Sequence, residues 1–166
     1  MHLASITKDS WLRTNVSQQE VYMPEKETLE RARKDKREGK AASTQAGEFV
    51  REEIEHIREG KHGARSTKQA IAIGLSKARR AGVDLPPSAG SSEETKEQAA
   101  RDRSKGKSGK RPSATRSRAT RKALKREGHS AASKQALSRQ ARSAAKKRSA
   151  ASRSRSAKKA AATRKK

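Results

Sequence analysis

The chain has no cysteine, and only one tryptophan, one tyrosine and one phenylalanine among its 166 residues. The absence of cysteine excludes disulfide bonds, thiol catalysis and cysteine-ligated zinc. Only 30% of the residues are hydrophobic, whereas 37% are charged. Because so few large apolar side chains offset little of the entropy lost on folding, we expect much of the chain to be disordered on its own.

Long hydrophobic runs are also absent. No apolar segment approaches the length of a membrane span, and residues 1–22 lack the apolar centre of a signal peptide. We therefore predict no membrane partner and a location in the cytoplasm where the protein is made. No paired nucleophile and base stand in an apolar setting, so we predict a protein that is not an enzyme and takes no cofactor.

Acidic residues are scarce in the C-terminal part of the chain. The formal net charge is +25, yet residues 1–100 hold 18 Lys and Arg against 16 Asp and Glu. Residues 101–166 hold 25 Lys and Arg against only Asp102 and Glu127. A basic segment of this kind predicts a polyanionic partner. Because it has no aromatic side chain to stack on bases, the segment favours the phosphates of a duplex over single strands.

From this charge pattern we predict non-sequence-specific binding of duplex DNA by a nucleoid-associated, histone-like protein. If about ten charges engage, log K against log salt should have a slope near −9. Two alternatives stay open, an RNA- or ribosome-associated protein and an adaptor that binds a protein partner. The predicted nucleic-acid-binding residues are Lys110, Arg111, Arg116, Arg118, Arg121, Lys122, Lys125, Arg126, Lys134, Arg139, Arg142, Lys146, Lys147, Arg148, Arg153, Arg155, Lys158, Lys159, Arg164, Lys165 and Lys166.

Composition and end signals divide the chain into five predicted parts. Met23 precedes a proline-started helical pattern, so we hypothesise that translation starts there; a disordered leader is the alternative. The parts are a disordered leader at 1–22, a solvated charged helix at 23–39, an amphipathic αα-hairpin at 43–82, a linker at 83–114 and a basic tail at 115–166.

The hairpin holds most of the large apolar side chains. Helical spacing predicts helices over 44–59 and 67–81, and Ser66 with Gln69 forms a capping box at the start of the second. The fold class predicted is mostly α, a small helical hairpin with a largely disordered basic tail that becomes helical on binding. So small a core predicts a marginal hairpin or a homodimer. Its predicted core residues are Phe49, Val50, Ile54, Ile57, Ile71 and Leu75.

Three short patterns suggest more specific chemistry. Ala70 to Ser76 is similar to the turn of a helix-turn-helix motif, although we favour an uninterrupted helix because Arg80 falls where that motif needs a buried aliphatic residue. Gly109-Lys110-Arg111-Pro112 is similar to the core of a minor-groove AT-hook, and we favour a linker turn. His56 and His62, with Glu52 and Glu59, have the chemistry of metal ligands, but we interpret them as solvated and predict no metal site.

Two connectors along the chain are similar to one another. Arg58-Glu59-Gly60 with a following His62 and Lys68-Gln69-Ala70 recurs as residues 126–128, 129 and 134–136. The second copy is interpreted either as a degenerate repeat of the helix-connector-helix unit or as chance similarity in a low-complexity segment.

The segment GEFVREEIEHIREGKHGARSTKQAIAIGLSKARRAGVDLPP, with the preceding MPEKETLERARKDKREGK, resembles a family of small, very basic, uncharacterised bacterial proteins, some of them labelled DNA-binding. STKQAIAIGLSKARRAG is the most specific stretch. The segment TRSRATRKALKREGHSAASKQALSRQARSAAKKR is similar to the C-terminal half of that family, so the resemblance covers about 23–166. In composition the tail is also similar to the arms of linker histones and bacterial histone-like proteins. The resemblance implies a bacterial origin and no established activity.

Overall fold

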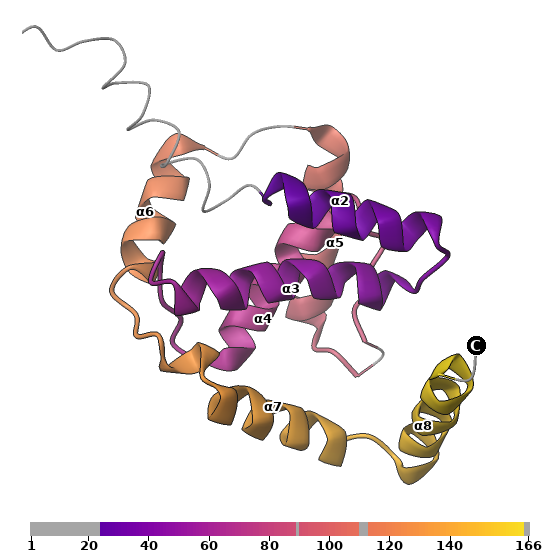
Figure 1. The fold of residues 1–166 in the computed structure, drawn as a ribbon. Coiled ribbons are helices and arrows are strands. Elements are labelled where there is room, and N and C mark those ends of the chain that lie inside the picture. The colour runs from indigo at the N-terminus through magenta and orange to yellow at the C-terminus, as the bar shows by residue number, and fades with distance from the viewer. Residues whose placement is uncertain (1–23, 89, 110–112, 165–166) are drawn as a thin grey trace, which may run out of the picture.

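A computed structural model describes residues 24–88, 90–109 and 113–164 (Figure 1). The predicted leader, including Met23, lies outside the described residues. The described parts are helical and contain no strand. The helices are α2 (Lys26–Arg37), α3 (Ala42–Arg58), α4 (Thr67–Arg80), α5 (Glu93–Ser108), α6 (Ala114–Leu124), the 3-10 turn η1 (Ser130–Ala132), α7 (Lys134–Lys146) and α8 (Ala150–Arg164).

The centre of the fold is the pair α3 and α4. Helix α2 packs on α3, α5 packs on α4, and η1 with α7 covers the end where α3 and α4 are joined. One cluster surrounds Phe49, which is 1% exposed, and takes Ala32 from α2 and Ala78 from α4. A second surrounds Ile57 and takes Ala131 and Ala132 from the C-terminal half. The two clusters place the core on both sides of α3.

Small residues build much of this core. Ala46, Ala70, Ala78, Ala99 and Ala132 are completely buried. Gly74 of α4 faces α3 so closely that a Cβ atom there would lie 2.7 Å from the Cα of Val50. Alanine and glycine allow helix backbones to approach closely, so many dispersion contacts form without large side chains.

The predicted fold class, a small hairpin with a largely disordered tail, is therefore wrong. The prediction counted only large apolar side chains, whereas eight of the thirteen buried hydrophobic residues in the described part of the chain are alanines. Helix α2, expected to be solvated, buries Ala32 and packs Leu29 against the Phe49 cluster. Helix α5 lies inside the range expected to be a linker, and α6, α7 and α8 occupy the expected tail. Helix α4 runs without interruption, as we favoured over a helix-turn-helix.

The two similar connectors lie against each other. The amide of Gly63 donates to the carbonyl of Leu124 and the amide of Ala64 to that of Gly128, both at 3.0 Å. Thr67 Oγ1 also donates to the carbonyl of Ala131 at 2.6 Å. These bonds fix the start of the C-terminal half to the loop between α3 and α4, which is why that half is not a free tail.

A buried carboxylate attaches α5 to α4. Asp102 is 1% exposed and accepts hydrogen bonds from Ser76 Oγ at 2.7 Å and Arg80 Nε at 2.9 Å. One of the two acidic residues in the basic half is therefore a structural contact. This contact also holds Arg80 along α4, with its charge compensated.

Candidate functional site

The predicted nucleic-acid-binding residues are spread over α6, α7, α8 and their connections. Lys110, Arg111, Lys165 and Lys166 lie outside the described residues, as do the side chains of Lys159 and Arg164. Arg121 is half-buried, whereas the other described members of the set are exposed. The structure thus places these positive charges on three helices and on the segments that connect them.

Helix α7 shows this arrangement most clearly. Leu137 packs against the Ile57 cluster and fixes which side of α7 faces the core. At about 100° per residue, Arg139, Arg142 and Lys146 fall within an arc of about 60° on the side opposite Leu137. These three side chains are exposed and form what we call the α7 basic stripe (Arg139, Arg142 and Lys146).

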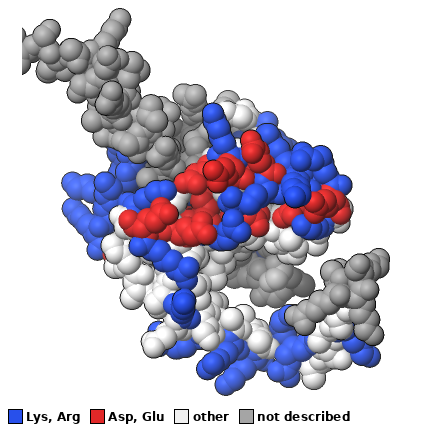
Figure 2. Space-filling view, viewed as in Figure 1, with Lys and Arg blue, Asp and Glu red and all other residues white. Residues whose placement is uncertain are grey.

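No described acidic side chain pairs with the charges of the stripe. Among the described side chains of α7 and α8, no lysine or arginine makes an ion pair, and neither helix contains an acidic residue. By contrast, Arg31 of α2 pairs with Glu48 at 2.6 Å. Figure 2 shows acidic side chains across the face formed by α2 and α3. Along the edge formed by α7 it shows lysine and arginine side chains and no acidic ones. Positive potential therefore concentrates on the C-terminal helices.

The predicted hairpin-core residues differ in burial. Phe49, Ile54 and Ile57 are buried, whereas Val50 and Leu75 are half-buried against the two clusters. Ile71 is half-buried and belongs to neither cluster.

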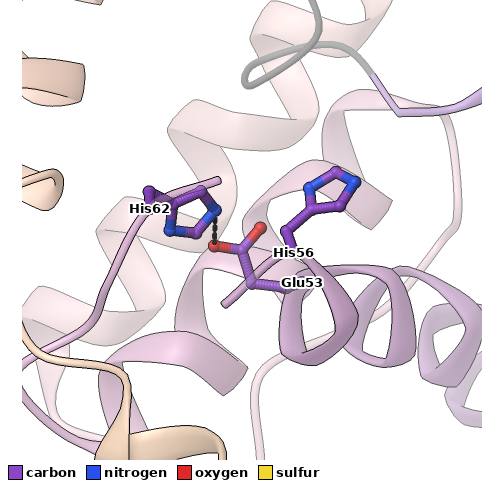
Figure 3. A group of neighbouring side chains, drawn as sticks. All are labelled: Glu53, His56 and His62. Carbon is purple, nitrogen blue, oxygen red and sulfur yellow. Dashed lines mark ion pairs between the residues drawn. The ribbon is translucent and has the colours of Figure 1, made fainter. Parts of the chain in front are cut away.

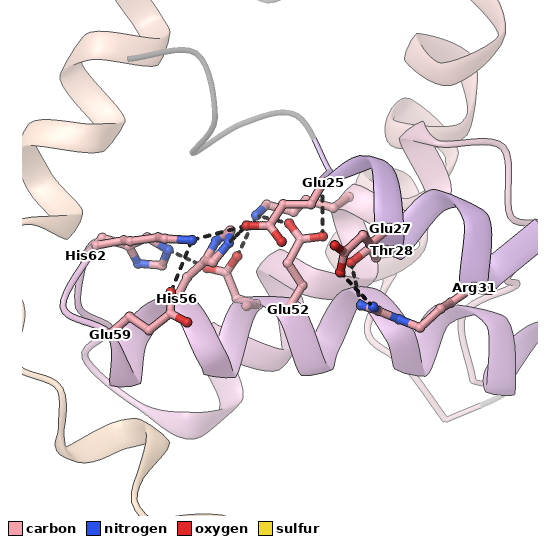
Figure 4. A network of polar contacts seen from close by, with 11 residues as sticks. Glu25, Glu27, Thr28, Arg31, Glu52, His56, Glu59 and His62 are labelled. Carbon is pink, nitrogen blue, oxygen red and sulfur yellow. Dashed lines mark hydrogen bonds and ion pairs between the residues drawn. The ribbon is translucent and has the colours of Figure 1, made fainter. Parts of the chain in front are cut away.

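A polar cluster that the sequence did not predict lies along α3, and Figure 4 shows its members Glu25, Glu52, His56 and His62. Its other members are Glu53, Lys61 and Lys77. All are buried except Glu25, which is half-buried, and Lys61, which is exposed. Lys77 of α4 is 7% exposed, and its Nζ lies 2.8 Å from Glu53 Oε2 and 3.3 Å from Glu52 Oε1. Both carboxylates are almost completely buried. One ammonium therefore compensates two adjacent buried carboxylates.

The interpretation of His56, His62 and Glu52 as solvated is wrong, although Glu59 is exposed as expected. His56 Nε2 lies 2.8 Å from Glu25 Oε1, which also accepts from Lys61 Nζ at 3.1 Å. The hydrogen bond with His56, followed by that from Lys61, lowers the pKa of the Glu25 carboxyl. Burial occurs because residues 61–67 cover this side of α3 and the C-terminal connector covers them in turn. The one feature of the sequence that pointed to this cluster was the spacing of Glu53 and His56, which lie one helical turn apart.

A cavity of about 290 Å³ opens onto this cluster. Its walls come from α4 and α6, with Gln69, Ser76 and Thr120 among the lining residues, and it reaches Glu53 and Lys77. The buried part of the cluster thus lies next to a space large enough for small ions and water.

Replacing Lys77 with methionine should lower the free energy of unfolding by about 3 kcal/mol, because two buried carboxylates lose their compensating charge. Chemical denaturation of the full chain in a chelating buffer measures the change. Lys68→Met is the matched control, since Lys68 is exposed on the same helix. A Lys77 variant as stable as the Lys68 variant would contradict the assigned pairing.

Comparisons with known proteins give one match. A family model, described as a family of unknown function (DUF6496), matches residues 26–89. This range contains α2, α3 and α4, so the match agrees with the resemblance to an uncharacterised family over the N-terminal part only. No curated protein matches the chain, and no solved structure matches it.

None of the described helices is both long enough and apolar enough to cross a membrane.

Proposed function

We propose that this protein binds duplex nucleic acid, with DNA as the preferred form, through the phosphate backbone and without reading sequence. The observation that carries the proposal is the α7 basic stripe, together with the exposed lysines and arginines that continue through residues 147–158. Exposed cations with no acidic neighbour release the counterions of a phosphate backbone when they bind it.

The composition of the C-terminal half favours a duplex over a single strand. Residues 101–166 contain no phenylalanine, tyrosine or tryptophan. Binding of single strands usually uses aromatic side chains on which bases stack. Helices that carry arginine and lysine along one side instead suit a regular array of phosphates.

The folded part of the chain supports this function by positioning α7. Leu137 and the contacts of residues 124–132 attach α7 to the α3–α4 pair. A stripe held in place loses less conformational entropy on binding than a disordered tail does. A bacterial nucleoid protein that coats DNA would use such an arrangement, and we place the protein there.

Competition experiments at one fixed salt concentration test the preferred polyanion. The full chain is bound to labelled duplex DNA and challenged with duplex DNA, duplex RNA or single-stranded DNA of equal phosphate content. We expect duplex DNA to compete best and single-stranded DNA worst. Stronger competition by duplex RNA would assign the protein to RNA, and equal competition by single strands would overturn the proposal for duplexes.

A further inference from the structure

Three buried side chains of the polar cluster have the chemistry of metal ligands. Glu53 and His56 come from α3 and His62 from the following connector, and they are 0%, 2% and 1% exposed. One ligand atom from each lies within 4.8 Å of the others. Figure 3 shows the His62 ring and the Glu53 carboxylate directed toward one another, with His56 beside them.

The hydrogen bonds of the two histidines leave their inner nitrogens without a hydrogen-bond partner. His56 Nε2 lies 2.8 Å from a Glu25 carboxylate oxygen, and His62 Nδ1 lies 3.1 Å from the carbonyl oxygen of Gly63. A carboxylate and a carbonyl only accept, so both outer nitrogens carry hydrogen. The inner atoms, His56 Nδ1 and His62 Nε2, are buried and have no hydrogen-bond partner. Metal-ligating histidines in proteins have this arrangement, with the second nitrogen donating to a carboxylate or a carbonyl.

The contact between His62 and Glu53 needs a proton or a metal cation between the two groups. His62 Nε2 lies 3.3 Å from Glu53 Oε1. A neutral ring whose proton is on Nδ1 would direct a lone pair at the carboxylate, which is repulsive. A second proton on His62, a proton on Glu53 Oε1 or a metal cation bound by both groups removes the repulsion.

We propose that Glu53 Oε1, His56 Nδ1 and His62 Nε2 bind one divalent transition-metal ion, with zinc as the fitting species. Two imidazoles and one carboxylate form a ligand set that zinc accepts, with one position left open. Tetrahedral ligands about 2 Å from zinc are about 3.3 Å apart, the distance that already separates His62 Nε2 from Glu53 Oε1, so any closure on binding falls on His56.

The charges around the cluster accommodate a dication. Lys77 Nζ forms an ion pair with Oε2 of Glu53, the oxygen that the proposed site does not use. With neutral histidines, four carboxylates face two ammonium groups across the network of Glu25, Glu52, Glu53, Glu59, Lys61 and Lys77. The cavity lined by Glu53 and Lys77 lies next to the proposed site.

Titration of the chelator-treated full chain with Co²⁺, followed by displacement with Zn²⁺, tests the proposal. We expect one ion per chain and a visible absorption band of cobalt at low coordination number. His56→Gln and His62→Gln should each weaken binding at least about 100-fold. His129→Gln is the matched control, because His129 is exposed on the other connector. Absence of stoichiometric binding, or equal binding by all three variants, would overturn the proposal.

A measurement on the unmodified protein covers the case in which the variants fail to fold. Nitrogen NMR of the imidazoles reports which ring nitrogens carry protons. On addition of one equivalent of zinc, Nε2 of His62 and Nδ1 of His56 should show the shifts of metal-bound nitrogen. A His62 ring that stays doubly protonated would identify its contact with Glu53 as an ordinary ion pair and overturn the zinc site.

Discussion

Replacing Arg139, Arg142 and Lys146 with glutamine should weaken duplex DNA binding by about 10²–10³-fold at about 0.1 M salt. Each phosphate contact contributes about 0.9 to the slope of log K against log salt, so at 0.1 M each lost contact costs nearly one log unit. The slope should become less steep by nearly 3 for the same reason. Fluorescence anisotropy with the full chain measures both quantities.

The matched control neutralises three charges elsewhere. Lys26, Arg33 and Lys36 are exposed on α2, and no ion pair involving them is among the described contacts. The variant Lys26→Gln, Arg33→Gln, Lys36→Gln loses the same positive charge but should lose less than about threefold in affinity. Equal losses in the two variants would mean that net charge alone governs binding, and would remove the α7 basic stripe from the interface.

Replacing Gly63 with alanine should lower the free energy of unfolding by about 4 kcal/mol. A Cβ atom at this position would lie 1.9 Å from the carbonyl oxygen of Glu127, and a backbone atom cannot rotate away. The segment that begins at Leu124 must therefore move off the α3–α4 connector. It then loses several hydrogen bonds, each contributing about 1 kcal/mol, together with the burial of Leu124.

Hydrogen exchange locates the damage that Gly63→Ala causes. The amides of Gly63 and Ala64 donate across the contact between the connectors, so both should lose protection. Gly47→Ala is the control, because Gly47 is exposed within α3 and nothing lies near its added methyl group. That variant should be neutral or up to about 1 kcal/mol more stable, since alanine favours the helix. Unchanged protection at Gly63 would show that the connectors do not meet in solution.

The sequence predicted the helices with strong end signals. Ser66 accepts the amide of Gln69 as the capping pattern indicated, and α4 ends at Arg80, within one residue of the prediction. Helical periodicity similarly predicted the buried positions of Phe49 and Ile57. These features are local, so spacing and capping residues are enough to identify them.

The packing of the C-terminal half could not be read in the same way. Ala131 and Ala132 are buried, yet alanines in a Lys- and Ser-rich segment give no apolar stripe by which to recognise a core. The polar cluster depends on contacts between segments far apart in the chain, such as Lys77 with Glu53. A histidine or a carboxylate looks solvated in a sequence until the residues that cover it are known.

The most direct test of the proposed function is the salt dependence of duplex DNA binding by the unmodified chain. If seven or more of the exposed lysines and arginines of residues 134–158 contact phosphates, a plot of log K against log salt should have a slope of about −6 or steeper. A slope shallower than about −2 would mean that at most two phosphates are contacted. That result would contradict the account, because the charges of the C-terminal helices would then not form the interface.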